Sequence, residues 1–345
     1  MSPVGEFWIC AEEARARRRL DALERLEVQY RKAQEQVDRR IADNDAAANS
    51  AAKKKEEIEA IRKQLAETEL TGSDRKQAEE KLKQHVAQYA KLKAQHKSSQ
   101  RFGEDPAVRQ DVVRLVNART QLGLDVIEIR RSLAELPAAY RRVGADAEIA
   151  AAVAALGGRA RLGPAKDYSG ENGPLARAQR IWASEKTPIY REDQHYRVSS
   201  IINERAPATW SLRHSTGPTV IPHSLGVAAG IVPDARTQKT TYLVDPNRRV
   251  EVHVVTIDRI DVGGTTLRNV TAYLLPPEGE DLGAKLGKAA YADYAFDIDG
   301  SRLQLSVSAQ QASAQKAQSQ KNQSQKNRSP ASIKAPLRMR TTRRP

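Results

Sequence analysis

The stretch WSLRHSTGPTVIP, residues 210–222, decides how the second half of the chain folds. Two segments with strand-forming residues flank a turn that contains Gly217 and Pro218, an order typical of a strand, a turn and a second strand. Further β-branched runs lie on both sides of it, at 197–202, 240–244, 250–257, 261–262 and 270–275. Turn residues separate these runs, so the segment from Tyr196 to Leu305 is predicted to be an all-β barrel or sandwich.

The chain ahead of this β segment is predicted to be helical. From Glu12 to Lys97 it consists mainly of Ala, Glu, Lys, Arg, Gln and Leu and has no Pro, which favours long helices. A heptad frame predicts a coiled coil with Leu23, Tyr30, Val37, Asn44, Ala51, Ile58 and Leu65 at a, and Leu26, Ala33, Arg40, Ala47, Lys54 and Ile61 at d. Because Asn44, Arg40 and Lys54 interrupt the apolar seam, its middle should pair weakly. A long single helix or a loose bundle is the alternative.

Several local signals set the boundaries of these helices. Thr71 to Asp74 contains a Gly followed by N-cap residues, which predicts a helical hairpin, and Asp105-Pro106 predicts the start of a third long helix. Leu136-Pro137 should break or kink that helix. We therefore expect an α+β multidomain chain: a helical, coiled-coil region at 1–158, a linker at 159–195, an all-β domain at 196–305 and a disordered basic tail at 306–345.

The β segment resembles a retropepsin-like aspartic protease domain. The resemblance lies in the order of its landmarks rather than in any one intact motif. These landmarks are an opening strand and turn at 196–207, the turn and TVIP phrase at 210–222, a short helix with Gly230-Ile231, a flap-like hairpin at 240–252, the phrases at 260–264 and 269–276, a closing Leu-Gly at 286–287 and the last strands at 296–305. The other interpretation is an unrelated small β-domain with ordinary strands and turns.

The catalytic position departs from the family's Asp-Thr-Gly pattern. Counting back from TVIP places Arg213 where the family has its Asp, whereas anchoring on Thr216-Gly217 places Ser215 there. The family's reaction needs two carboxylates that share one proton, one from each subunit of a dimer. Neither Arg nor Ser can take that role at neutral pH, so the resemblance implies a pseudoenzyme.

Another carboxylate could in principle replace the missing Asp. The candidates are Asp193, which precedes the first strand, and Asp234 and Asp245 within the β segment, and all three are expected away from the Thr-Gly turn. The flap-like hairpin would carry Asp245 and Asn247 at its tip, where relatives have a Gly. An active aspartic endopeptidase with an unusual catalytic turn is therefore the alternative function.

No cofactor or metal is expected. Cys10 is the only cysteine, so neither an intramolecular disulfide nor a Cys-rich zinc site can form. The histidines at 195, 214, 223 and 253 fall at no metal-ligand spacing, and no GxGxxG or Walker phrase is present. His214-Ser215 is better explained as two polar turn residues than as a base beside a nucleophile.

The charge distribution suggests additional partners. The formal net charge is +14, and nine cations lie in the 306–345 segment, which has no Asp or Glu. Such a segment would contact nucleic acid, another anionic polymer or a membrane surface nonspecifically. No signal peptide or transmembrane run is visible, so a cytoplasmic location is the default expectation. The third functional hypothesis is thus a nucleic-acid- or envelope-associated coiled-coil protein.

Our leading hypothesis is a noncatalytic protein that forms a homodimer through its helices. The β-domain would then serve as a scaffold or as a module that binds a peptide or protein ligand. Helical dimerisation would raise the effective concentration of the β-domains for pairing, and the resemblance implies a groove between the two paired domains.

Overall fold

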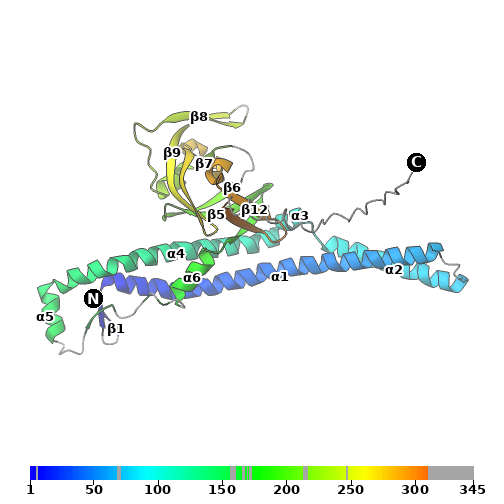
Figure 1. The fold of residues 1–345 in the computed structure, drawn as a ribbon, viewed down its shortest axis with the longest axis horizontal. Coiled ribbons are helices and arrows are strands. Elements are labelled where there is room, and N and C mark those ends of the chain that lie inside the picture. The colour runs from blue at the N-terminus through cyan, green and yellow to red at the C-terminus, as the bar shows by residue number, and fades with distance from the viewer. Residues whose placement is uncertain are drawn as a thin grey trace, which may run out of the picture.

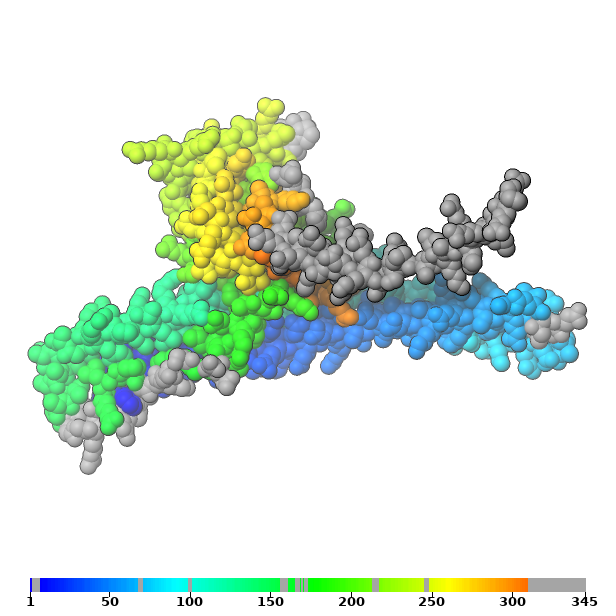
Figure 2. Space-filling model, in the orientation of Figure 1, coloured from blue at the N-terminus to red at the C-terminus, as the bar shows by residue number. Residues whose placement is uncertain are grey.

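The computed structural model describes residues 1–4, 7–67, 71–155, 161–164, 168, 170, 173–212, 217–245 and 248–309. A long layer of helices from the N-terminal half carries a β-rich C-terminal domain on one side (Figure 1). In the space-filling view the β-rich domain, yellow to orange, sits directly on the helical layer (Figure 2). None of the helices in these ranges is long and apolar enough to cross a membrane.

The helical layer is built around one very long helix. Its members are α1 (Ala11–Glu67), α2 (Gly72–Gln95), α3 (Ser99–Glu104), α4 (Pro106–Gly144), α5 (Ala147–Ala155) and α6 (Pro174–Trp182). Helix α1 runs beside α4 over its first half and beside α2 over its second half (Figure 1). The predicted hairpin near Thr71 and the predicted helix start at Pro106 are both confirmed.

The predicted heptad positions of α1 pack inside the chain. Leu23 is fully buried against Leu122, Val126 and Ile129 of α4. Ala33 and Val37 continue this contact with the start of α4, and they are joined there by Ile41, which the predicted frame did not place in the seam. Farther along, the burial of Ala51 and Ile58 follows from the pairing of α1 with α2. The apolar seam of α1 is therefore covered by helices of its own chain.

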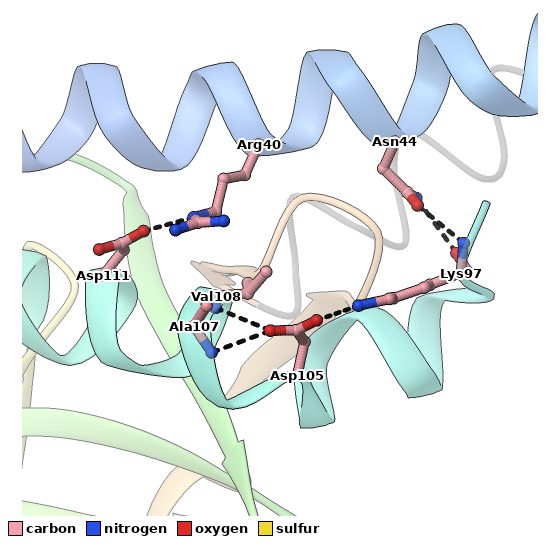
Figure 3. Close-up of polar contacts among 7 residues, drawn as sticks. All are labelled: Arg40, Asn44, Lys97, Asp105, Ala107, Val108 and Asp111. Atoms are coloured by element: carbon pink, nitrogen blue, oxygen red, sulfur yellow. Dashed lines mark hydrogen bonds and ion pairs between the residues drawn. The ribbon is translucent and has the colours of Figure 1, made fainter. Parts of the chain in front are cut away.

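The polar interruptions of that seam meet polar partners at the point where α2 returns to α4 (Figure 3). The Asn44 side-chain amide accepts the N–H of Lys97 at 2.8 Å and donates to the Lys97 carbonyl at 3.1 Å. Arg40 pairs with Asp111. Asp105 caps α4 by accepting the N–H of Ala107 at 2.8 Å, and its carboxylate also pairs with Lys97. The residues that weaken the apolar seam thus fix the helix connection.

Two predicted boundaries differ from the structure. Helix α4 continues through Pro137 to Gly144, since Leu136 and Ala139 on either side are buried in a small cluster with Cys10. The segment predicted as a linker contains strand β3 (Arg161–Leu162), helix α6 and strand β4 (Lys186–Glu192). Strand β3 pairs with β2 (Phe7–Ile9), which pairs with β1 (Ser2–Val4), so the helical region also contains a small sheet.

The β-rich domain is a strongly bent sheet of ten strands. Their order is β12-β13-β4-β5-β6-β11-β7-β10-β9-β8, and β5 also pairs with β9. The remaining bounds are β5 (His195–Ile202), β6 (Ala206–Leu212), β7 (Thr219–Ile221), β8 (Lys239–Asp245), β9 (Arg248–Val262), β10 (Thr265–Leu274), β11 (Lys285–Leu286), β12 (Tyr294–Asp299) and β13 (Gln304–Ala309). The predicted strands fall within these elements, except that Leu275 lies just after the end of β10. The domain begins earlier and ends later than expected, and residues 310–345 lie outside the described ranges.

One buried arginine joins the helical layer to the β-rich domain. Arg119 of α4 is 0% exposed. Its guanidinium donates to the carbonyl oxygens of Ile181 (3.3 Å), Trp182 (2.7 Å) and Ser184 (3.1 Å), and to Thr187 Oγ1 (3.3 Å). It also lies 5.1 Å from the centre of the Trp182 ring. Arg119 therefore holds the end of α6 and the start of β4 against α4.

Two further contacts join the helical layer to the β-rich domain. Gly123 lies one turn beyond Arg119, and a Cβ at this position would come within 2.6 Å of the Trp182 ring and 2.9 Å of Ile201 in β5. At the other end, Leu303 in the β12–β13 turn is buried in the helical cluster beside Phe102. Helix α4 can approach the sheet closely only because glycine stands at position 123.

We predict that Arg119→Met strongly destabilises the chain. Methionine retains most of the volume but has no donors, which leaves buried carbonyl groups unsatisfied at a cost of about 3 kcal/mol in the free energy of unfolding. The measurement is urea unfolding followed by circular dichroism. The matched control is Arg131→Met on the exposed face of the same helix, which should change the free energy by less than about 0.5 kcal/mol. Equal effects of the two substitutions would contradict the role assigned to Arg119.

Candidate functional site

A short strand inserted between two others organises the region of the predicted catalytic turn. Strand β11 runs parallel to β6, with Leu286 opposite Leu212, and antiparallel to β7, with Lys285 opposite Val220. Strand β11 therefore lies between β6 and β7, and residues 213–218 form the connection between those two strands. This connection contains Arg213, Ser215 and Thr216, the predicted degenerate positions, which lie outside the described residues.

The described end of this connection rests directly on the backbone that follows β11. A Cβ at Gly287 would lie 2.2 Å from the Gly217 carbonyl oxygen and 2.7 Å from the Thr219 nitrogen. The buried N–H of Gly287 donates to Thr219 Oγ1 at 3.2 Å. Glycine is therefore required at position 287 by close backbone packing. The predicted closing Leu-Gly phrase and the predicted turn residue Gly217 are thus brought together.

A short helix follows β7 and ends in a glycine. Helix α7 spans His223–Ala228. Gly230 has φ +75°, its N–H donates to the Val227 carbonyl at 3.0 Å, and the N–H of Ile231 donates to the Gly226 carbonyl at 2.8 Å. This Schellman ending explains the Gly230-Ile231 phrase, since the left-handed conformation favours glycine.

An apolar face lies beside the turn, on the opposite side of the sheet from the main core. Val220 of β7, Val252 of β9 and Leu275 after β10 are buried within it. Four partly exposed side chains surround them: Tyr242, Val250, Tyr273 and Leu282. The rings of Tyr242 and Tyr273 meet edge to face with their centres 6.0 Å apart. We call these seven residues the apolar face.

Sequence reasoning missed the apolar face. Its residues come from five separate segments, and only the strand order places β8 and β7 on either side of β9 and β10. The available signal was the alternation of Val250 and Val252 in one strand and of Tyr273 and Leu275 in the next. That signal fixes which side chains share a face but does not identify their neighbours.

The predicted flap corresponds to the hairpin formed by β8 and β9. Asp245 is the last residue of β8, its backbone lies opposite Arg248, and the register shifts between Leu243 and Asp245. Asn247, the other predicted flap residue, lies outside the described ranges. Strand β8 forms one edge of the ten-stranded sheet.

The described carboxylates near this region do not form an acid pair. Asp234 accepts bonds from the Thr237 hydroxyl (2.9 Å) and the Arg236 N–H (2.9 Å), and these bonds lower the pKa of its carboxyl. Hydrogen bonds from Arg248 lower the pKa of Asp281 in the same way. Asp193 lies in the turn between β4 and β5 with φ +48°. A shared proton requires one carboxyl with a raised pKa, which neither Asp234 nor Asp281 provides.

The described ranges also contain no group of His, Cys, Asp and Glu side chains that could hold a metal ion. His253 lies on β9, and His195 begins β5. His223 begins α7, and Cys10 is buried and unpaired before α1. His214 lies outside the described residues.

Comparison with known proteins gave one structural similarity. No family model matches the chain, and no curated protein matches it. Among solved structures, the chain is similar to a retropepsin-like aspartic protease from Rickettsia conorii, with a TM-score of 0.29 and 16% sequence identity. The match covers 36% of this chain and 98% of that chain.

We predict that Thr219→Val destabilises the turn although it preserves the side-chain shape. Valine removes the acceptor of the buried Gly287 N–H, which should cost about 1–3 kcal/mol in the free energy of unfolding. Thr219→Ser retains the hydroxyl and is the matched control. The measurement is urea unfolding followed by tryptophan fluorescence, to which the fully buried Trp210 of β6 contributes. A serine variant as unstable as the valine variant would refute the hydrogen-bond explanation.

Proposed function

We propose that this chain is a noncatalytic member of the retropepsin-like fold whose β-rich domain binds an extended peptide segment along the apolar face. The main support for the proposal is that the apolar face lies beside a β6–β7 connection with no Asp or Glu. From Arg205 to Pro233 the sequence contains no Asp or Glu. A surface with aromatic and aliphatic side chains and no acid pair is suited to binding and unsuited to hydrolysis by this route.

Topology supports the retropepsin-like part of the proposal. Strand β11 between β6 and β7, Gly287 against Gly217, helix α7 and the β8–β9 hairpin occur in the order of the landmarks in the sequence. Their spatial grouping around one turn is what the resemblance implies.

Peptide binding is supported by the composition and exposure of the apolar face. Tyr242 and Tyr273 each present a partly exposed ring whose polar end can hydrogen-bond to a peptide backbone, while the buried Val252 and Leu275 support the rings from below. Tyrosines with such support are typical of energetically dominant contacts in interfaces. An extended segment could pass between these rings and the turn.

We also propose self-association, but through the β-rich domain and not through the helices as the sequence suggested. Leu23, Val37 and Ile58 of α1 already pack against α4 or α2 of the same chain, so a homodimer would use the β-rich domain rather than this seam. Sedimentation at micromolar concentration tests this part. A chain that sediments as a monomer would contradict it.

The full-length chain should fail to cleave casein at acidic pH, with or without pepstatin. It should nevertheless select peptides from a displayed library of random decapeptides. For a selected peptide, Tyr273→Ala should weaken binding about tenfold by fluorescence anisotropy. The matched control is Tyr89→Ala, which removes a similarly exposed ring from α2 and should leave binding unchanged. Pepstatin-sensitive cleavage would establish the active endopeptidase instead, and failure to select any peptide would overturn the binding role.

A further inference from the structure

Four cations form a straight row along the first half of helix α1. They are spaced seven residues apart, and all four are exposed: Arg18, Arg25, Lys32 and Arg39. Seven residues are close to two turns of an α-helix, so neighbouring cations are about 10.5 Å apart and the set is about 31 Å long. We call these four residues the basic row.

The basic row faces away from the rest of the molecule. Arg25 follows the buried Leu23 by two positions, so its side chain points about 200° around the helix from the seam with α4. Helix α4 in turn lies between this part of α1 and the β-rich domain (Figure 1). The basic row therefore lies on the side of the helical layer opposite the β-rich domain, and it shares no residue with the apolar face.

The charges of the basic row are not neutralised by the protein itself. Other arginines of the same helix form ion pairs: Arg19 with Glu128, Arg31 with Glu27 and Arg40 with Asp111. Within the described parts of the chain, no acidic side chain forms an ion pair with a member of the basic row. Asp21 and Glu35 border the row on one side without pairing with it. The row therefore presents four uncompensated positive charges to a ligand.

The residues between these cations favour a phosphate backbone as that ligand. Ala22, Gln29 and Gln36 complete the same face of α1, which has no acidic, aromatic or large apolar side chain. Guanidinium groups and side-chain amides commonly donate to phosphate oxygens, and an arginine can do so with two parallel bonds. A surface that stacks on bases would carry aromatic rings, and a helix that lies in a membrane interface would expose an apolar stripe.

We propose that the basic row binds double-stranded nucleic acid through its phosphates and without sequence preference. The row of about 31 Å is close in length to one turn of a B-form duplex, which is about 34–36 Å. Because one rigid helix holds the cations at fixed intervals, little freedom is lost when they meet a rigid duplex. The formal net charge of +14 favours the encounter with such a polyanion.

The salt dependence of duplex binding by the full-length chain tests this inference. The row variant combines Arg18→Gln, Arg25→Gln, Lys32→Gln and Arg39→Gln, because Gln is a good helix former without charge. The anisotropy of a fluorescein-labelled duplex of about 20 base pairs is measured from about 50 to about 200 mM NaCl. Each lost phosphate contact lowers the slope of the logarithm of affinity against the logarithm of salt by about 0.9, so the row variant should lose about 3 to 4 of this slope. At about 100 mM NaCl it should bind at least about tenfold more weakly.

The matched control removes the same number of charges from exposed positions on helix α2. It combines Lys76→Gln, Lys81→Gln, Lys83→Gln and Lys91→Gln, which do not form a single row. The control should lower the slope by less than about 1. The cations of 306–345 are present in every variant, so their contribution to binding is constant. An equal loss in the row and control variants, or an unchanged slope in the row variant, would overturn the inference.

Two further variants separate the charge of the row from the integrity of the helix. The combination Arg18→Lys, Arg25→Lys and Arg39→Lys keeps every charge and should keep the slope, because counterion release depends on charge. Arg25→Gln alone should lower the slope by about 0.9. This single substitution on the solvent side of α1 serves as the test if the fourfold variant does not fold. A slope that Arg25→Gln leaves unchanged would overturn the inference.

Two other ligands distinguish a duplex from competing polyanions. Binding to vesicles with about 30% phosphatidylserine should be equal in the row and control variants, and a loss confined to vesicles would assign the row to a membrane surface instead. A single strand of the same length should bind more weakly than the duplex, and a row-dependent preference for the single strand would overturn the proposal. Peptide binding at Tyr273 is unaffected by any of these substitutions, so the two proposals fail independently.

Discussion

The guanidinium of Arg119 is a full charge buried inside the protein, and the groups that accept its hydrogen bonds are three backbone carbonyls and one hydroxyl rather than a carboxylate. Burial lowers its pKa to about 10, so the group stays charged at neutral pH and must be solvated by the protein itself. The oxygens of Ile181, Trp182 and Ser184 do this. A charge so deep in the interior is tolerated only when its donors have partners. The positions of α4, the end of α6 and the start of β4 are therefore determined together.

This constraint extends from the helices to the candidate site through strand pairing. Thr187, the second residue of β4, accepts a hydrogen bond from Arg119. Strand β4 pairs with β5, β5 pairs with β6, and β6 pairs with β11. The backbone at Gly287, just after β11, packs against Gly217 and Thr219. Because each step is a hydrogen-bonded register, a shift of α4 against the sheet would be passed on to the turn. The helical layer and the β-rich domain are accordingly one structural unit, although composition divides them sharply.

Sequence patterns predicted the parts of the fold that depend on local signals. Asp105 before Pro106 is a cap whose chemistry is local, and the strands between Tyr196 and Leu305 follow from β-branched runs. Arg119 could not be identified in this way, because an arginine in a charged helix is by default exposed. The prediction that α4 breaks or kinks at Pro137 was wrong because it used only the local preference of proline to end a helix. The packing of Leu136 and Ala139 in the cluster with Cys10 extends the helix past this residue. Strand β4 was missed because the Gly, Pro and polar residues from Arg159 onward favoured a linker over the whole segment.

The candidate site also combines features that the sequence pointed to with features that depend on tertiary packing. The contact of Gly287 with Gly217 joins two phrases that the sequence resemblance singled out, whereas the apolar face depends on which strands are neighbours in the sheet. Under the proposed function, the turn can be retained although the catalytic acids are missing. The packing at Gly287 and the hydroxyl of Thr219 support the turn through backbone geometry and do not require a carboxylate. Two acids held close together destabilise a fold unless they share a proton. A chain that lacks them can keep the turn, and with it the neighbouring face, without the electrostatic strain that catalysis requires.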